Sequence, residues 1–206
     1  MTRFLFSIGN TNGPVKLYST DGTAGGTAAI QAPGLGSLGS FGVSVPDFTA
    51  FGGKLYFLGV GNGLGPIVYG TDGKTAGPSA PINGSGGQAI PQVLQAINGH
   101  LLMSGPIKVG VPGLWSSTNG VNFTELESGA GAISLAVSHG LVFFGSDLSP
   151  SGIGNFWRTD GTAAGTRNIT LHGSVMPNDF LAVANGRTVF VDQGLWVTDG
   201  TAGGTS

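Results

Sequence analysis

Residues Leu195–Thr205 read LWVTDGTAGGT, and near the other end of the chain residues Leu17–Thr27 read LYSTDGTAGGT. A third copy, Phe156–Thr166, reads FWRTDGTAAGT. Two shorter copies are VYGTDGK at Val68–Lys74 and LWSSTNG at Leu114–Gly120. Recurrence of one motif along a chain is the sequence signature of a repeat architecture, so the five copies define one repeated unit.

The spacing of the copies is typical of propeller blades. The turn residue falls at Asp21, Asp72, Asn119, Asp160 and Asp199, in steps of 51, 47, 41 and 39 residues. Periods of about 40 to 50 residues fit β-propeller blades and fit the short coils of a β-helix poorly. A second turn, such as Asn98-Gly99 or Asn185-Gly186, lies upstream between apolar runs. Asn-Gly in that setting predicts a type I′ hairpin, which needs positive φ at both central residues.

Each unit therefore predicts four antiparallel strands joined by a tight turn, a longer loop and an Asp-Gly turn. We expect an all-β protein, a β-propeller of about five four-stranded blades. It forms one repeat domain over residues 1–206, with units at about 1–45, 46–90, 91–130, 131–176 and 177–206. The first unit begins with its second strand, 3–8, and the last stops before its outer strand. Either the chain is a fragment of a longer repeat array, or its ring is left incomplete or is completed by another copy. Open sheet edges favour pairing with another chain, so a homo-oligomer is one expectation.

Composition excludes several classes of function. Charged residues make up 9 % of the chain, against roughly 25 % in ordinary soluble domains, and 40 of the 206 residues are glycine. The formal net charge is −2 and the eight Lys and Arg residues are scattered, so we expect no nucleic-acid partner. The apolar runs are shorter than the roughly 18 to 20 residues of a membrane helix, so no membrane span is expected. Without cysteine, the chain can form neither a disulfide nor a thiolate metal site.

The Asp-Gly turn has a structural and a metal-binding interpretation. An Asp or Asn side chain can accept a hydrogen bond from the backbone two residues on, while the glycine supplies positive φ. We expect this turn role for Asp21, Asp72, Asn119, Asp160 and Asp199. A calcium loop needs six to eight oxygen ligands, usually from several carboxylates, whereas each loop here offers one. We therefore predict no metal and no cofactor.

The aromatic residue before each turn also has two interpretations. It is Tyr18, Tyr69, Trp115, Trp157 or Trp196. Such rings either pack between blades or stack on the ring of a bound sugar, and packing is the commoner role of a tryptophan or tyrosine in this position. Arg158 replaces a small residue of the motif, and we expect its side chain at the surface.

Candidate catalytic residues are sparse. A glycosidase needs two carboxylates that flank a bond, and the two glutamates, Glu125 and Glu127, are expected on one solvated strand face. His100, His139 and His172 lack the spacing of metal ligands. No serine-nucleophile or phosphate-loop motif is present, so we expect no enzyme activity.

The motif resembles the ELWxxDGTxxGT repeats of large bacterial secreted and surface proteins. The glutamate before Leu-Trp is missing in every copy, where Lys16, Ile67, Gly113, Asn155 and Gly194 stand instead. Residues 116–124, SSTNGVNFT, also resemble the Asp-box turn of sialidase and lectin propellers. The first resemblance implies a β-propeller at an extracellular or cell-surface location, without implying an activity.

Two functions follow as hypotheses. The first is a non-enzymatic recognition module that binds carbohydrate, with one shallow site per blade and avidity from repetition. The second is a structural or adhesive repeat in a surface or filament assembly, which low charge and unclosed ends favour. The partner is then either a glycan or another protein.

Overall fold

The structure is a computed structural model, and it describes residues 4–8, 16–33, 35–38, 48–61, 66–78, 93–108, 111–128, 132–146, 155–169 and 179–206. Within these ranges the chain forms strands and turns and no helix, so the all-β prediction is confirmed. His172 and Arg3 lie outside the described residues. None of the described segments is a helix that is long and apolar enough to cross a membrane.

The strands form five antiparallel sheets, four of them in sequential order, whereas in the second sheet both β4 and β5 pair with β6. The first holds β1 (Phe4–Ile8), β2 (Lys16–Thr20) and β3 (Ala28–Ala29). The second holds β4 (Leu35–Leu38), β5 (Thr49–Phe51), β6 (Lys54–Gly61), β7 (Pro66–Thr71) and β8 (Ala76–Pro78). The third holds β9 (Val93–Ile97), β10 (His100–Lys108), β11 (Val111–Ser117) and β12 (Thr124–Ser128). The fourth holds β13 (Ala132–Ser138), β14 (Leu141–Ser146), β15 (Asn155–Thr159) and β16 (Arg167–Asn168), and the last holds β17 (Asp179–Ala184), β18 (Arg187–Val191) and β19 (Leu195–Thr198).

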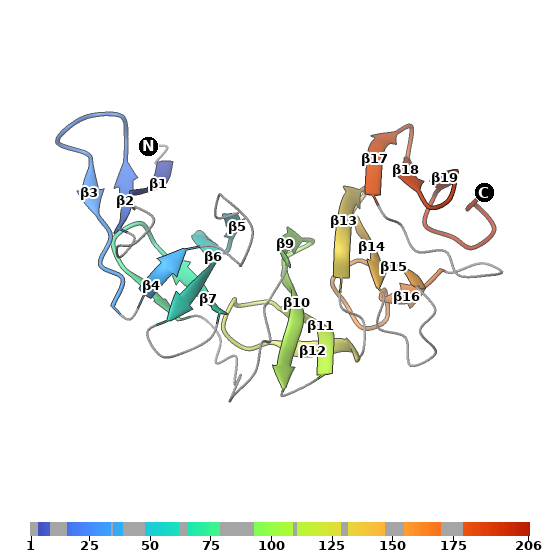
Figure 1. Cartoon of the computed structure of the whole chain (residues 1–206), viewed down its shortest axis with the longest axis horizontal. Helices are drawn as coiled ribbons and strands as arrows, with labels where there is room; N and C mark the ends of the chain where they lie inside the picture. Colours follow the sequence, from blue (N-terminus) through green and yellow to red (C-terminus); the bar gives the residue numbers. More distant parts are fainter. Residues whose placement is uncertain are drawn as a thin grey trace.

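The five sheets follow one another around an open arc, with the two chain ends on opposite arms (Figure 1). The third and fourth sheets have the predicted four strands, whereas the first and last have three among the described residues. Neighbouring sheets touch along the arc, because β5 contacts β9 and β13 contacts β17. This sequence of small meander sheets is a β-propeller-like arrangement.

Both predicted turn types are present. The tight turns have positive φ at both central residues, for example 46° at Asn98 and 76° at Gly99. The Asp-Gly turns place their glycine at φ between 72° at Gly120 and 99° at Gly161. Glycine tolerates this backbone region without the steric cost that a Cβ brings, which explains its recurrence at these positions.

The boundary between the first two units was predicted too late. We placed it at residue 45, but β4 pairs with β6 and so belongs to the second sheet. The reason is a difference in strand length, because β6 has eight residues and the short β5 pairs only with Lys54–Tyr56. β4 pairs with the remaining backbone of Gly59–Gly61, and its Leu35 is buried there.

Side chains between the sheets form the core. Leu17 and Tyr69 share one buried cluster across the first two sheets, and Leu114 and Phe144 share another across the third and fourth. Hydrogen bonds add to this packing. Asn98 Nδ2 donates to the carbonyl oxygens of Gly140, at 2.8 Å, and Asp160, at 3.1 Å, so one side chain ties the third sheet to both turns of the fourth.

Candidate functional site

The turn loop that follows Thr159 is closed by its own side chains. Asp160 Oδ1 accepts hydrogen bonds from the Thr162 backbone N–H, at 2.9 Å, and from the Thr162 hydroxyl, at 2.7 Å. The Thr162 hydroxyl oxygen in turn accepts the Gly165 N–H at 3.0 Å. The hydroxyls of Thr159 and Thr166 share a further bond of 2.8 Å across the mouth of the loop. Thus five of the motif's positions take part in the hydrogen bonds of this loop.

The loops at Asp21 and Asp199 repeat this network bond for bond. Their Oδ1 atoms accept from the N–H and hydroxyl of Thr23 and of Thr201. In each loop the aspartate carboxylate lies so close to the last glycine that a Cβ on this residue would overlap it, at Gly26 as at Gly204. The glycine is therefore required by space rather than by φ.

The two shorter copies of the motif, which contain Asp72 and Asn119, form a shorter version of the turn. Asp72 Oδ1 accepts the backbone N–H groups of Lys74, at 2.9 Å, and Thr75, at 3.0 Å. Asn119 Oδ1 accepts from Val121 and Asn122 at 2.9 Å in the same way. Because an amide oxygen accepts these bonds as well as a carboxylate does, the geometry itself does not require a charge.

Hydrogen bonds to the carboxylates lower the pKa of several of these aspartates. The Thr162 hydroxyl lowers the pKa of Asp160 and the Thr201 hydroxyl lowers that of Asp199, because donors stabilise the ionised form. At Asp72 the backbone N–H groups of Thr75 and Lys74 have the same effect on the pKa. Across the described residues no group of three or more His, Asp and Glu side chains gathers as a metal site.

Each pre-turn aromatic lies directly opposite an apolar residue of the preceding strand. Tyr18, Tyr69, Trp157 and Trp196 stack on Phe6, Phe57, Phe144 and Phe190, with centroids 5.3 to 6.3 Å apart and planes within 13°. Trp115 pairs with Met103 in the same register. This cross-strand stacking was not predicted, since the partner lies 6 to 13 residues upstream across a connection of variable sequence.

Burial divides these five rings into two groups. Tyr69 and Trp115 are buried, and the Trp115 indole N–H donates to the Gly105 carbonyl at 2.9 Å, so their faces are not available for a sugar. Tyr18, Trp157 and Trp196 are half-buried. For these three rings, stacking on a sugar stays a hypothesis.

Arg158 does not lie where its sequence predicts. We expected its side chain at the surface, but the residue is half-buried and its Nε is buried without a hydrogen-bond partner. It lies opposite Phe143, on the side of the fourth sheet that packs against the last sheet. The motif position of Arg158 therefore lies between two sheets. An alignment of the repeats does not show which positions face a neighbouring sheet.

Glu125 and Glu127 lie on β12, where the register shifts by one residue opposite Leu114 and Trp115. Leu126, between them, packs against the buried Leu114 and Phe144. Both glutamates are half-buried. His139 is exposed in its turn, and His100 is half-buried with its Nδ1 2.9 Å from the Ser116 hydroxyl.

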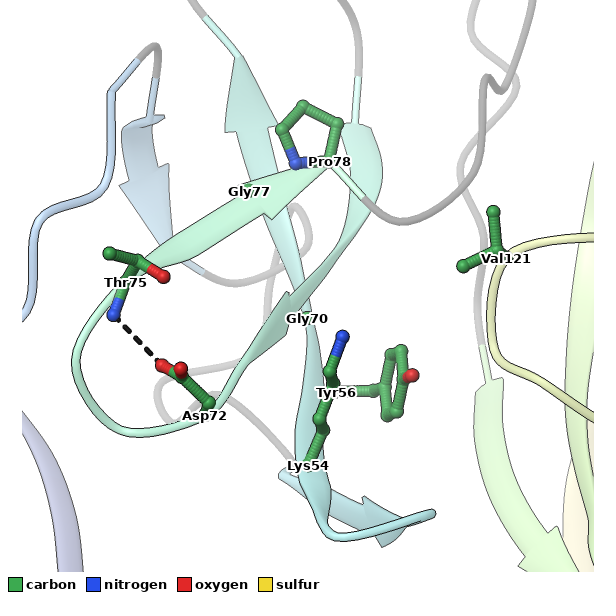
Figure 2. A pocket seen from close by; sticks show the side chains of 8 residues that line it. All are labelled: Lys54, Tyr56, Gly70, Asp72, Thr75, Gly77, Pro78 and Val121. Atoms are coloured by element: carbon green, nitrogen blue, oxygen red, sulfur yellow. Dashed lines mark hydrogen bonds between the residues drawn. The ribbon is translucent and has the colours of Figure 1, made fainter.

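A groove of about 240 Å³ opens between the second and third sheets (Figure 2). Lys54 and Tyr56 reach it from β6, Asp72 and Thr75 from the Asp-Gly turn, and Val121 from the facing turn of the third sheet. Gly70, Gly77 and Pro78 complete its wall. The groove is therefore lined by one cation, one carboxylate, the hydroxyl-bearing side chains of Tyr56 and Thr75, and the apolar side chains of Pro78 and Val121. A second groove, of about 250 Å³, lies between the first two sheets beside Leu5 and Phe51.

The first groove was not predicted from the sequence, because its lining combines residues from two units. Asp72 was singled out as a turn residue, and its place at the groove was not foreseen. The absent Cβ at Gly70 was the available signal, since the motif has a side chain at this position in the other four copies.

No protein-family model and no curated protein matches the chain. Solved structures match its fold. A puromycin hydrolase has a TM-score of 0.61 at 12 % identity, over 99 % of this chain and 37 % of its own. A chain from an analysis of two prolyl endopeptidases has 0.57 at 11 %, over 99 % and 32 %. A putative TolB from Agrobacterium tumefaciens has 0.52 at 13 %, over 93 % and 72 %.

The chain spans about a third of the length of the hydrolase and endopeptidase chains that it matches. At such low identity the likeness shows the fold alone, which is β-propeller-like.

Proposed function

We propose that this protein is a non-enzymatic recognition module that binds carbohydrate in the groove between the second and third sheets. The observation that carries the proposal is the lining of this groove, where the Lys54 ammonium, the Asp72 carboxylate and the Thr75 hydroxyl meet the apolar edges of Pro78 and Val121. A sugar ring presents hydroxyl groups around its rim and C–H groups on its faces. The lining supplies partners for both.

Charge and size narrow the ligand to a neutral one of about a single sugar unit. Asp72 is ionised at neutral pH, as an ordinary aspartate is, and the backbone N–H groups of Thr75 and Lys74 lower its pKa further, so it acts as an acceptor beside the donor Lys54. One positive and one negative group favour a neutral ligand over an anion. The volume, about 240 Å³, falls below the roughly 300 to 1,000 Å³ of sites for drug-sized molecules.

The non-enzymatic part of the proposal is supported by the acid groups of the groove. Hydrolysis of a glycosidic bond ordinarily needs two carboxylates, one on each side of the bond. Asp72 is the single carboxylate among the described residues that line this groove. Binding without turnover is the chemistry that such a lining supports.

The proposal extends the resemblance to repeats of bacterial secreted and surface proteins. A recognition module of this type would act outside the cell, in keeping with that resemblance. The half-buried rings of Tyr18, Trp157 and Trp196 offer further shallow stacking positions on other sheets. Several weak sites on one chain would raise avidity without any one of them being strong.

A glycan array on the purified chain, with and without calcium, tests this function. A bound sugar would then be titrated calorimetrically against Lys54→Met, which keeps the aliphatic stem and removes the ammonium. We expect a loss of about tenfold or more in affinity, because a hydrogen bond to a charged group contributes about 1.5 to 3 kcal/mol. The control is Asp199→Asn, in the turn of the last sheet that corresponds to the turn of Asp72 in the groove. This variant should leave affinity unchanged.

Two results would overturn the proposal. A blank array in both conditions removes carbohydrate as the ligand class. Binding that survives Lys54→Met unchanged removes the groove as the site. A blank array would also favour the second candidate, a structural or adhesive repeat scaffold, which is supported by the hydrogen bonds that tie the turn of Asp160 to its own loop and to Asn98.

A further inference from the structure

The leucine that opens the last copy of the motif is exposed where all its counterparts are buried. Leu17, Val68, Leu114 and Phe156 hold this position in the first four sheets and are between 0 % and 3 % exposed. Leu195 holds it in the last sheet and is 71 % exposed. The position thus belongs to an inter-sheet contact that the last sheet leaves unmade.

The opposite end of the arc shows the reverse of this pattern. In the sheets from the second to the last, the residue opposite the pre-turn aromatic is 0 % exposed; these residues are Phe57, Met103, Phe144 and Phe190. In the first sheet it is Phe6, which is 36 % exposed. Phe4 and Ile8 flank it two residues away on the same side of β1, and they are 63 % and 57 % exposed.

The two exposed faces are the two halves of one repeated contact. Adjacent residues of a strand point to opposite sides of the sheet, so the leucine position and the aromatic position face different neighbours. Between the fourth and last sheets, Phe156 contacts Phe190 with ring centroids 4.6 Å apart, and Trp196 stacks on Phe190 in the same cluster. The leucine-position face of one sheet therefore packs on the aromatic-position face of the next.

We propose that the face of the last sheet around Leu195 packs on the face of the first sheet around Phe6 in a second copy of this chain, so that copies associate head to tail. Each chain carries both halves, one at each end of its arc (Figure 1). A second copy continues the series of inter-sheet contacts that already joins the five sheets within one chain. Burial of Phe4, Phe6, Ile8 and Leu195 supplies the apolar driving force.

The symmetry of this association follows from the position of the faces. Because the two faces differ and lie at opposite ends, the contact is heterologous, and it grows into a ring or an open chain of copies rather than stopping at an isologous dimer. The association needs neither a sugar nor the groove at Lys54. It also differs from pairing between the free edges of two β1 strands, which would leave Leu195 uninvolved.

Sedimentation velocity over a range of concentrations tests the proposal. The wild-type chain should show a mass that rises with concentration above the 20.5 kDa of one chain. Leu195→Glu removes one half of the contact at an exposed residue that does not disturb the core, and Phe6→Glu removes the other half. Each variant alone should remain a single chain, with a circular dichroism spectrum like that of the wild type.

An equimolar mixture of Leu195→Glu and Phe6→Glu separates head-to-tail packing from all other modes. One intact face survives in each variant, so the mixture should form a dimer and nothing larger. Val137→Glu, at an exposed apolar residue on β13, the first strand of the fourth sheet, is the control and should associate like the wild type. A wild-type chain that stays monomeric at its highest soluble concentration overturns the proposal, as do association that survives Leu195→Glu and a mixture that fails to dimerise.

Discussion

Replacing Gly165 by alanine should destabilise the protein although its backbone conformation suits any residue. The added Cβ would overlap the Asp160 carboxylate, so this side chain has to swing out of the loop. Asp160 Oδ1 would then lose the two bonds that it accepts from Thr162, at 2.9 and 2.7 Å. The substitution thus tests whether the motif is conserved along the chain for the hydrogen-bond network that the structure describes.

The magnitude follows from these two bonds. A typical intramolecular hydrogen bond contributes about 1 kcal/mol net, so the loss of two costs about 2 kcal/mol. Alanine also stabilises by about 0.5 kcal/mol, because it restricts the unfolded chain more than glycine does. The net loss is about 1.5 kcal/mol, which for a chain of this size lowers Tm by about 3 to 6 °C.

Thermal unfolding followed by tryptophan fluorescence measures this loss. The matched control is Gly203→Ala, because a Cβ there meets no atom within 4 Å and the fourth unit already carries Ala164 at the same motif position. It should be neutral or slightly stabilising, and Gly204→Ala, one residue on, should behave like Gly165→Ala. If Gly165→Ala and Gly203→Ala unfold at the same temperature, the carboxylate network does not stabilise the loop and the reasoning fails.

Three further predictions follow from the same contacts. Stability should fall as the pH drops below about 4, because the pKa values of Asp72, Asp160 and Asp199 are lower in the folded state than in the unfolded chain. Such a group stabilises the fold fully at a pH above its unfolded pKa, which is about 3.9 for aspartate, and this stabilisation is lost as the pH falls through the folded pKa. The triple Asp→Asn variant, which copies Asn119, should show a weaker acid dependence in urea titrations, and an unchanged dependence would contradict the assignment. Arg158→Ser should raise the free energy of unfolding by about 1 kcal/mol in urea, since it removes a buried unpaired Nε and restores the hydroxyl that Ser19 and Ser116 donate to the next turn; a loss of stability would refute this. Asn98→Gly keeps the positive φ but removes the bonds to Gly140 and Asp160, so it should cost about 1 kcal/mol, more than Asn185→Gly in the corresponding turn of the last sheet, and equal losses would count against an inter-sheet role.

The turns were predictable because their causes are local. The turn at Asn98-Gly99 needs positive φ at two adjacent residues, and the residue types Asn and Gly alone predict this backbone conformation. The same holds for Asp21 and its glycine, where the side chain bonds to the backbone two residues on. From such turns at regular spacing, the all-β class and the order of strands within each unit followed directly.

Contacts between sheets were not predictable in the same way. Tyr69 and Trp115 occupy the same motif position as Trp157, yet they are buried and it is half-buried, because burial depends on the neighbouring sheet. β4 was missed because the need for it arises from the length of β6, which lies 16 residues downstream. The groove beside Lys54 combines two units and has no signature within either one.

One repeated contact is made by different residues in different sheets, which explains why the copies diverge where they do. Ser19 donates to the Gly73 carbonyl of the next sheet, whereas the second sheet has Gly70 at that position. There the ring of Tyr56, directly opposite Gly70, covers the glycine and reaches Gly120 of the third sheet in place of a serine.

A variable position of the motif is therefore coupled to its cross-strand neighbour. Serine at position 70, as at Ser19 and Ser116, would bring its Cβ to 3.0 Å from the Tyr56 ring, so this ring would have to shift by a few tenths of an ångström. In the third sheet, where Ser116 is kept, His100 supplies the ring that lies against Gly161. Transfer of a single residue from one copy to another should be unfavourable at such positions, because the two side chains that face the next glycine differ together from copy to copy.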